Sequence, residues 1–162
     1  MSAVPSESAR MASAAEARYR IQAPNSRPRS IRVVALDALS EALLVRLARG
    51  SWRHAVFLTA AANDEGTLSD LAGRPRDVTR EVDAADLVVM VATPGGHAHA
   101  ASTIGGACRR RRVTTTALVV GADGAPDEAL ASTLAQVRPW ALMLVIATPH
   151  DYIDDMLVAL RA

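Results

Sequence analysis

The sequence predicts an α/β fold in three layers, with a parallel sheet of about five strands between helices on both faces. Two observations predict it. Short segments that are apolar throughout recur along the chain, and amphipathic segments bounded by helix-start and helix-stop residues separate them. Strands that lack a polar face are typical of parallel sheets, because helices cover both sides of such sheets. We therefore expect a ligand to bind at the carboxyl ends of the strands, near the point where the strand order reverses.

The N-terminal 29 residues differ in composition from the rest of the 162-residue chain. They are rich in Ser, Ala, Pro and Arg and lack a sustained apolar period. Such a segment cannot bury enough apolar surface to fold, so we expect residues 1–29 to form a disordered N-terminal arm. Residues 30–162 have the length of one ordinary domain, and we expect them to form a single α/β domain.

Five segments carry the strand signal, a short run of aliphatic residues bounded by turn residues. They are residues 31–36, 55–60, 87–92, 115–120 and 142–147. The third of these is the most apolar in the chain. The stretch 63–76 is polar and contains Gly and Pro, so we expect a long connection there with room for a short element.

Helices are expected between these strands, where apolar residues follow the helical period. The ranges are 41–49, 78–84, 99–111, the segment from Pro126 to just before Pro139, and 151–160. Asp37 or Ser40 can cap the first helix, and Gly50 suits the position after its end. Pro126 is well placed as the first residue of its helix. Together the elements predict a Rossmann-like arrangement.

The composition excludes several classes of function. A net charge of +1 lacks the basic excess that is typical of proteins that bind nucleic acids or anionic membranes. The chain contains no Lys, which excludes a Walker-type phosphate lysine, a Schiff-base lysine and a lysine general base. No apolar run approaches the roughly 18 residues of a membrane span, and no secretory signal begins the chain. The single cysteine, Cys108, cannot form an internal disulfide, so we expect a cytoplasmic protein. From the charge and the hydropathy we expect neither nucleic-acid nor membrane partners.

A Gly-Gly pair follows the third expected strand and precedes a helix. Backbone N–H groups at such a position can bind an anion, and the helix dipole assists. A plain strand-to-helix turn is the alternative. The candidate ligand- and phosphate-binding residues are Thr93, Gly95, Gly96, His97 and Ala98 in this loop and Ser40 at the end of the first strand.

Three histidines fall at the same predicted edge of the sheet. His97 and His99 are one residue apart, and His150 with Asp151 follows the fifth strand. A His-x-His pair with a third imidazole and a carboxylate can hold Zn²⁺ or another divalent cation. Solvated polar loop residues are the alternative interpretation.

Two further features have structural interpretations. The run from Arg109 to Arg112 ends a helix, where cations complement the negative end of the dipole; contact with a phosphate or an acidic partner is the alternative. Cys108 lies near the same helix end, a setting that disfavours a thiolate, and we expect it to fill space in the core.

Several segments occur in an order that resembles the nucleotide-binding half of the FtsZ/tubulin family. Residues 31–36 resemble its first strand, residues 84–90 its GADMVFV strand, residues 95–101 its phosphate-binding GGGTGTG loop, residues 115–120 its LTVAVV strand, and residues 143–151 its TLIVIPND segment. The resemblance implies an α/β fold with a nucleotide site at the loop of residues 95–101.

The departures from that family pattern concern its decisive residues. The first loop, residues 37–41, contains no glycine and two carboxylates, and His97, Ala98 and His99 replace the family's Gly, Thr and Gly. The second domain, which carries the family's acidic catalytic loop, has no counterpart. We therefore expect neither GTP hydrolysis nor polymerisation of the FtsZ kind.

These observations leave rival functions open. The leading hypothesis is a non-hydrolysing binding or assembly module that recognises a nucleotide or another phosphorylated small molecule, within a homo-oligomer or a larger complex. The alternative is a small metal-dependent enzyme in which His97, His99 and His150 bind a divalent metal and Asp151 acts as base or orients a ligand. A structural subunit that docks through its apolar helix faces is a third class.

Overall fold

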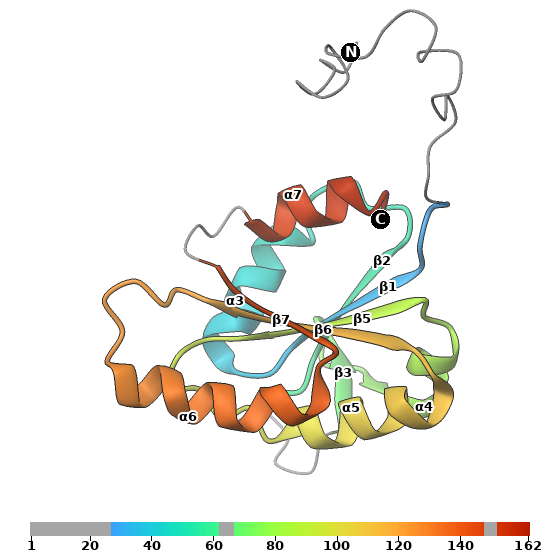
Figure 1. The fold of residues 1–162 in the computed structure, drawn as a ribbon. Coiled ribbons are helices and arrows are strands. Elements are labelled where there is room, and N and C mark those ends of the chain that lie inside the picture. Colours follow the sequence, from blue (N-terminus) through green and yellow to red (C-terminus); the bar gives the residue numbers. More distant parts are fainter. Residues whose placement is uncertain (1–26, 62–66, 148–151) are drawn as a thin grey trace, which may run out of the picture.

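The computed structural model describes residues 27–61, 67–147 and 152–162. One sheet runs through these residues, and its strands lie in the order β4-β3-β2-β1-β5-β6-β7 (Figure 1). The strands are β1 (Ile31–Ala35), β2 (Ala55–Thr59), β3 (Leu68–Asp70), β4 (Pro75–Arg76), β5 (Leu87–Ala92), β6 (Thr114–Val120) and β7 (Met143–Ala147). The helices are α3 (Ala38–Leu47), α4 (Val78–Asp83), α5 (Ala100–Arg111), α6 (Asp127–Val137) and α7 (Tyr152–Ala159), with a 3₁₀ turn η1 (Arg138–Trp140) after α6.

The five aliphatic segments expected as strands are the five parallel strands of this sheet. β2, β1, β5, β6 and β7 lie side by side and run in the same direction. From β1 the chain moves to β2 on one side and then to β5, β6 and β7 on the other, so the order reverses between β1 and β5. This reversal brings the first turn of α3 next to the loop that follows β5.

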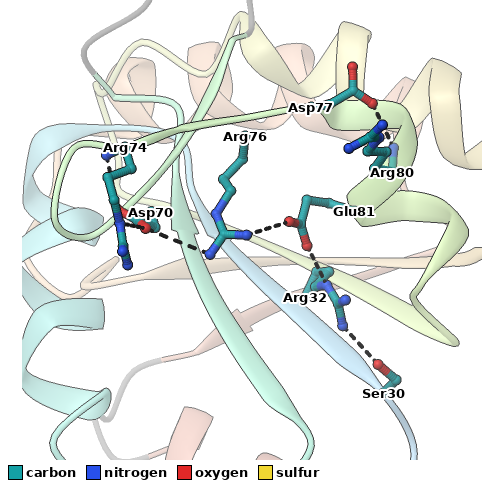
Figure 2. Close-up of polar contacts among 8 residues, drawn as sticks. All are labelled: Ser30, Arg32, Asp70, Arg74, Arg76, Asp77, Arg80 and Glu81. Atoms are coloured by element: carbon teal, nitrogen blue, oxygen red, sulfur yellow. Dashed lines mark hydrogen bonds and ion pairs between the residues drawn. The ribbon is translucent and has the colours of Figure 1, made fainter.

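The sheet is larger than the expected five strands, because β3 and β4 add an antiparallel hairpin at the β2 edge. Polar contacts of Asp70 hold this hairpin in the stretch expected as a connection (Figure 2). Its carboxylate accepts hydrogen bonds from the backbone N–H groups of Ala72 and Arg74, each at 3.0 Å, and pairs with the Arg74 guanidinium at 2.7 Å. Gly73 turns the chain at φ +82°, a conformation that favours glycine. Of these contacts, the bond from the Arg74 N–H contributes most to lowering the pKa of Asp70.

An ion-pair chain joins this hairpin to the rest of the fold (Figure 2). Arg32 on β1 donates from Nε to Oε2 of Glu81 on α4 at 2.8 Å, and both side chains are largely buried. Glu81 also contacts Arg76 of β4 at 3.5 Å, and Arg76 lies 3.7 Å from Asp70. The one charged residue of β1 is therefore paired where it is buried, which offsets the cost of removing it from water.

Apolar side chains pack on both faces of the sheet. One cluster includes Val34 and Met90 of the sheet with Ile104 of α5. The other includes Val33 of β1 with Leu44 of α3 and Leu157 of α7. Figure 1 accordingly shows α3 and α7 on one side of the sheet and α4, α5 and α6 on the other. None of the helices in the described part of the chain has the length and hydrophobicity of a membrane span.

Candidate ligand-binding site

Asp37 is the central polar residue at the carboxyl edge of the sheet. It follows β1, and its backbone is extended so that its side chain can cap α3. Its Oδ1 accepts from the backbone N–H of Ser40 at 2.9 Å, and the Ser40 hydroxyl bonds back to the Asp37 backbone, which completes a capping box. α3 therefore begins at Ala38, three residues earlier than expected.

The same carboxylate also holds the loop after β5. Oδ2 accepts from the backbone N–H of Thr93 at 2.7 Å, and Oδ1 accepts from the Thr93 hydroxyl at 2.9 Å. Gly96 lies so close that a Cβ atom there would come within 2.6 Å of Oδ2. The second glycine of the Gly-Gly pair is thus required by the approach of Asp37, which is 7% exposed.

The backbone N–H groups expected to bind phosphate donate to protein atoms instead. Gly95 donates to the Thr133 hydroxyl at 2.9 Å and to the carbonyl of Ala129 at 3.2 Å. Gly96 donates to the carbonyl of Thr93 at 3.1 Å, and Ala98 donates to the side-chain oxygen of Gln136 at 2.8 Å. The bonds of Gly95 and Ala98 join the loop to α6. An anion that bound to the N–H groups of Gly95, Gly96 and Ala98 would have to displace their present acceptors.

The predicted phosphate-binding residues therefore come together in one region but face different surroundings. Ser40 is fully buried in the capping box, and Ala98 is buried in the core. His97 is exposed to solvent. Thr93 lines the pocket described below. Their role in phosphate binding stays a prediction.

A pocket of about 790 Å³ opens at this edge, between α3 and the loops that follow β5 and β6. Three chain segments far apart in sequence line it, and most of the lining atoms are apolar. The residues are Leu39, Ala42, Leu43, Arg46, Thr93, Pro94, Val120, Gly121, Asp123 and Ala125. Its position beside the reversal of strand order is where open parallel sheets usually bind ligands, and its volume is within the range of small-molecule sites.

Two charged residues of opposite sign line the pocket from opposite walls. Arg46 projects from α3, and Asp123 lies in the loop after β6. Both residues are exposed. A guanidinium can bind a phosphate or carboxylate in bidentate fashion, and a carboxylate can accept hydrogen bonds from hydroxyl groups. The aliphatic side chains between them suit a planar or hydrocarbon part of a ligand.

Sequence reasoning missed these two charges and the α3 face that carries one of them. Leu39, Leu43 and Arg46 recur at a spacing of three to four residues, which places them on one face of a helix. That spacing was a usable signal, since this helix was expected next to the site. Asp123 carries no such signal, because a lone carboxylate in a Gly-containing loop is typical of solvated turns.

The predicted metal-binding histidines are only partly described. The rings of His97 and His99 stack with centroids 5.7 Å apart, and both residues are exposed. His150 and Asp151 lie outside the described residues. Within residues 27–61, 67–147 and 152–162, no three His, Cys, Asp or Glu side chains gather in a group that could hold a metal.

The arginine run at the end of α5 makes contacts within the protein. Arg109 donates to the carbonyl of Pro139 at 2.8 Å and lies over the Trp140 ring, 5.2 Å from its centroid. Arg111 pairs with Asp83 of α4 at 2.7 Å. These contacts dock α5 against η1 and α4. Cys108 is fully buried, as expected, and burial raises the pKa of its thiol to about 11, so the thiol is protonated at neutral pH.

Comparison with known protein families and with curated protein sequences finds no match to this chain. The pocket and its residues are therefore the features from which a function can be inferred.

Proposed function

We propose that this protein is a non-hydrolysing module that binds a nucleotide or another phosphorylated small molecule in the pocket beside α3. The observation that carries the proposal is an apolar pocket of about 790 Å³ at the reversal of strand order, with Arg46 on one wall. The anionic group contacts Arg46, the apolar part of the ligand packs on Leu39 and Leu43, and Asp123 accepts hydrogen bonds from its hydroxyl groups.

The proposed anion contact is Arg46 and not the Gly-Gly loop. The N–H groups of Gly95, Gly96 and Ala98 already donate to protein atoms, and the Asp37 carboxylate occupies the space beside Gly96. A second anion there would meet that carboxylate at close range. Arg46 offers a cation on the pocket wall, about one and a half helical turns beyond the capping box.

One feature supports binding without hydrolysis. The lining of the pocket, as far as the chain is described, contains one carboxylate and neither His97 nor His99. The proposed fold is the three-layer, Rossmann-like one, which the two apolar clusters on opposite faces of the sheet support. The resemblance to the FtsZ/tubulin family remains a prediction, and the proposal does not depend on it.

The test is thermal unfolding in the presence of AMP, GMP, ribose 5-phosphate, glucose 6-phosphate or inorganic phosphate at millimolar concentration. A ligand at about 100 times its dissociation constant stabilises the folded state by about 2.7 kcal/mol, which raises Tm by several degrees. Arg46→Gln should weaken the binding of the stabilising compound about tenfold to hundredfold, because a hydrogen bond to a charged group contributes about 1.5–3 kcal/mol.

The matched control is Arg49→Gln, which removes an exposed charge just beyond the end of the same helix and outside the pocket lining. It should bind as the unmodified protein does. A panel in which no compound shifts Tm would contradict the proposal, and so would equal effects of the two arginine substitutions.

A further inference from the structure

β7 forms one edge of the described sheet, and it exposes large apolar side chains together with Leu142, which directly precedes it and donates its N–H to Thr115 of β6. The relative exposures of Leu142, Met143 and Ile146 are 80%, 55% and 48%, whereas every residue of β5 is buried. Side chains alternate between the two faces of a strand, so Leu142 and Ile146 lie on one face and Met143 on the other. The apolar exposure of this edge therefore extends over both faces of the sheet.

The two edges of the sheet differ in how they are protected. β4, at the far edge, has two residues, Pro75 and Arg76, and proline and charge are both devices that prevent strand addition. β7 has five residues, and the segment 139–147 contains no charged residue and no proline after Pro139. Among the residues that the structure describes, β7 pairs only with β6, so its backbone groups that point away from β6 can pair with another strand.

We propose that β7 pairs antiparallel with β7 of a second copy of this chain, around a two-fold axis, so that two sheets become one. The segment is uncharged, so a second copy of it brings no like charges together. Apolar side chains exposed on both faces need a partner that covers both faces. A second copy offers this, because its own sheet has helices on both sides (Figure 1).

Symmetry also favours a contact between two β7 strands over a contact between β7 and β4. A β7–β7 contact is isologous and closes as a dimer, whereas a β7–β4 contact is heterologous and would continue from copy to copy into a ring or a filament. Pro75 lacks the N–H group that such a β4 contact would need, and Arg76 already pairs with Glu81 and Asp70. The dimer does not depend on the ligand proposed for the pocket, because no residue of β7 lines it.

The experiment is sedimentation equilibrium of the full chain without ligand at 1–100 µM. The unmodified protein should approach a mass of about twice the 17.1 kDa of one chain. Leu142→Asp and Ile146→Arg each bring a charge into the apolar contact of both copies and should weaken dimerisation about tenfold or more. Leu142 is the better probe of assembly, because a side chain that is 80% exposed contributes little to the folded monomer.

Val45→Asp is the matched control, because Val45 is a 40% exposed apolar residue on α3, outside β7. It should dimerise as the unmodified protein does. Circular dichroism checks that each variant is folded, and an unfolded variant is replaced by the other β7 variant. A monomeric unmodified protein at 100 µM would overturn the proposal. Dimers that survive both β7 substitutions, or that Val45→Asp disrupts equally, would also overturn it.

Discussion

The Asp37 side chain does two things that the fold needs. It caps α3 through the Ser40 N–H, and it fixes the loop after β5 through the N–H and hydroxyl of Thr93. These contacts join the two elements on either side of the point where the strand order reverses. Thr93 also lines the pocket. The position of this part of the lining therefore depends on the Asp37 carboxylate, which also caps α3.

Substitution of Asp37 separates these two contributions. Asp37→Ser keeps a good helix cap but is too short to reach Thr93, so it should destabilise the protein by about 1–3 kcal/mol through the unsatisfied Thr93 N–H. Asp37→Ala also removes the cap and should cost about 0.5–2 kcal/mol more. Urea unfolding monitored by circular dichroism measures both. An Asp37→Ser variant as stable as the unmodified protein would show that the contact to Thr93 contributes nothing.

At this scale the sequence predicts local contacts better than distant ones. Asp37 or Ser40 was expected to cap the first helix, and Asp37 is the cap, because capping residues adjoin the helix that they begin and have a compositional signature. The bond from Asp37 to Thr93 joins residues 56 positions apart, and no local pattern indicates it. For the same reason the sequence left a phosphate-binding loop and a plain strand-to-helix turn both open for the Gly-Gly pair, and it gave no sign that Asp37 lies against Gly96.

Among the elements, α5 shows how closely the helices on one face of the sheet pack against their neighbours. Its two adjacent glycines face different surroundings. A Cβ at Gly105 would come within 2.5 Å of the Trp140 Cβ in η1, whereas a Cβ at Gly106 would meet only the flexible end of Arg110 at 3.6 Å. The helix thus approaches η1 at a glycine, and the contacts of Arg109 with Pro139 and Trp140 reinforce that approach.

Adjacent substitutions in α5 should therefore have opposite effects. Gly105→Ala forces α5 and η1 apart and should destabilise the protein by about 1–3 kcal/mol. Gly106→Ala gains helix propensity without a clash and should stabilise it by up to about 1 kcal/mol. Thermal unfolding of the two variants under one set of conditions makes the comparison. A change of the same sign in both would show that the Gly105 contact is not as close as described.

The elements that the sequence predicts well are those with a strong hydrophobic period. All five parallel strands were expected to within one residue at each end, since aliphatic runs of this length suit buried strands. The β3–β4 hairpin was missed because strands of three and two residues are too short to show alternation. Side-chain contacts of Asp70 and the Arg32–Glu81–Arg76 chain hold it, and these join segments that are distant in sequence.

For the whole molecule, the strand order places α3 and the loops after β5 and β6 at the carboxyl edge of the sheet, where the sequence predicted a ligand site, and ligand binding there stays a prediction. The sequence did not predict the pocket itself, because the pocket depends on the distance between α3 and the loops after β5 and β6. Arg46 and Asp123 look like ordinary surface charges until those three segments are placed together. The position of the pocket thus follows from topology, and the charges that line it follow only from packing.

Binding of the ligand in the pocket beside α3 can be tested residue by residue. The measurement is a ¹H–¹⁵N correlation spectrum of the labelled protein, recorded during titration with the compound that stabilises it most. We expect the largest shifts at Leu43, Arg46, Thr93 and Gly121, and none at Arg112 at the opposite edge. Shifts confined to the loop of residues 95–99, or centred on that opposite edge, would contradict it.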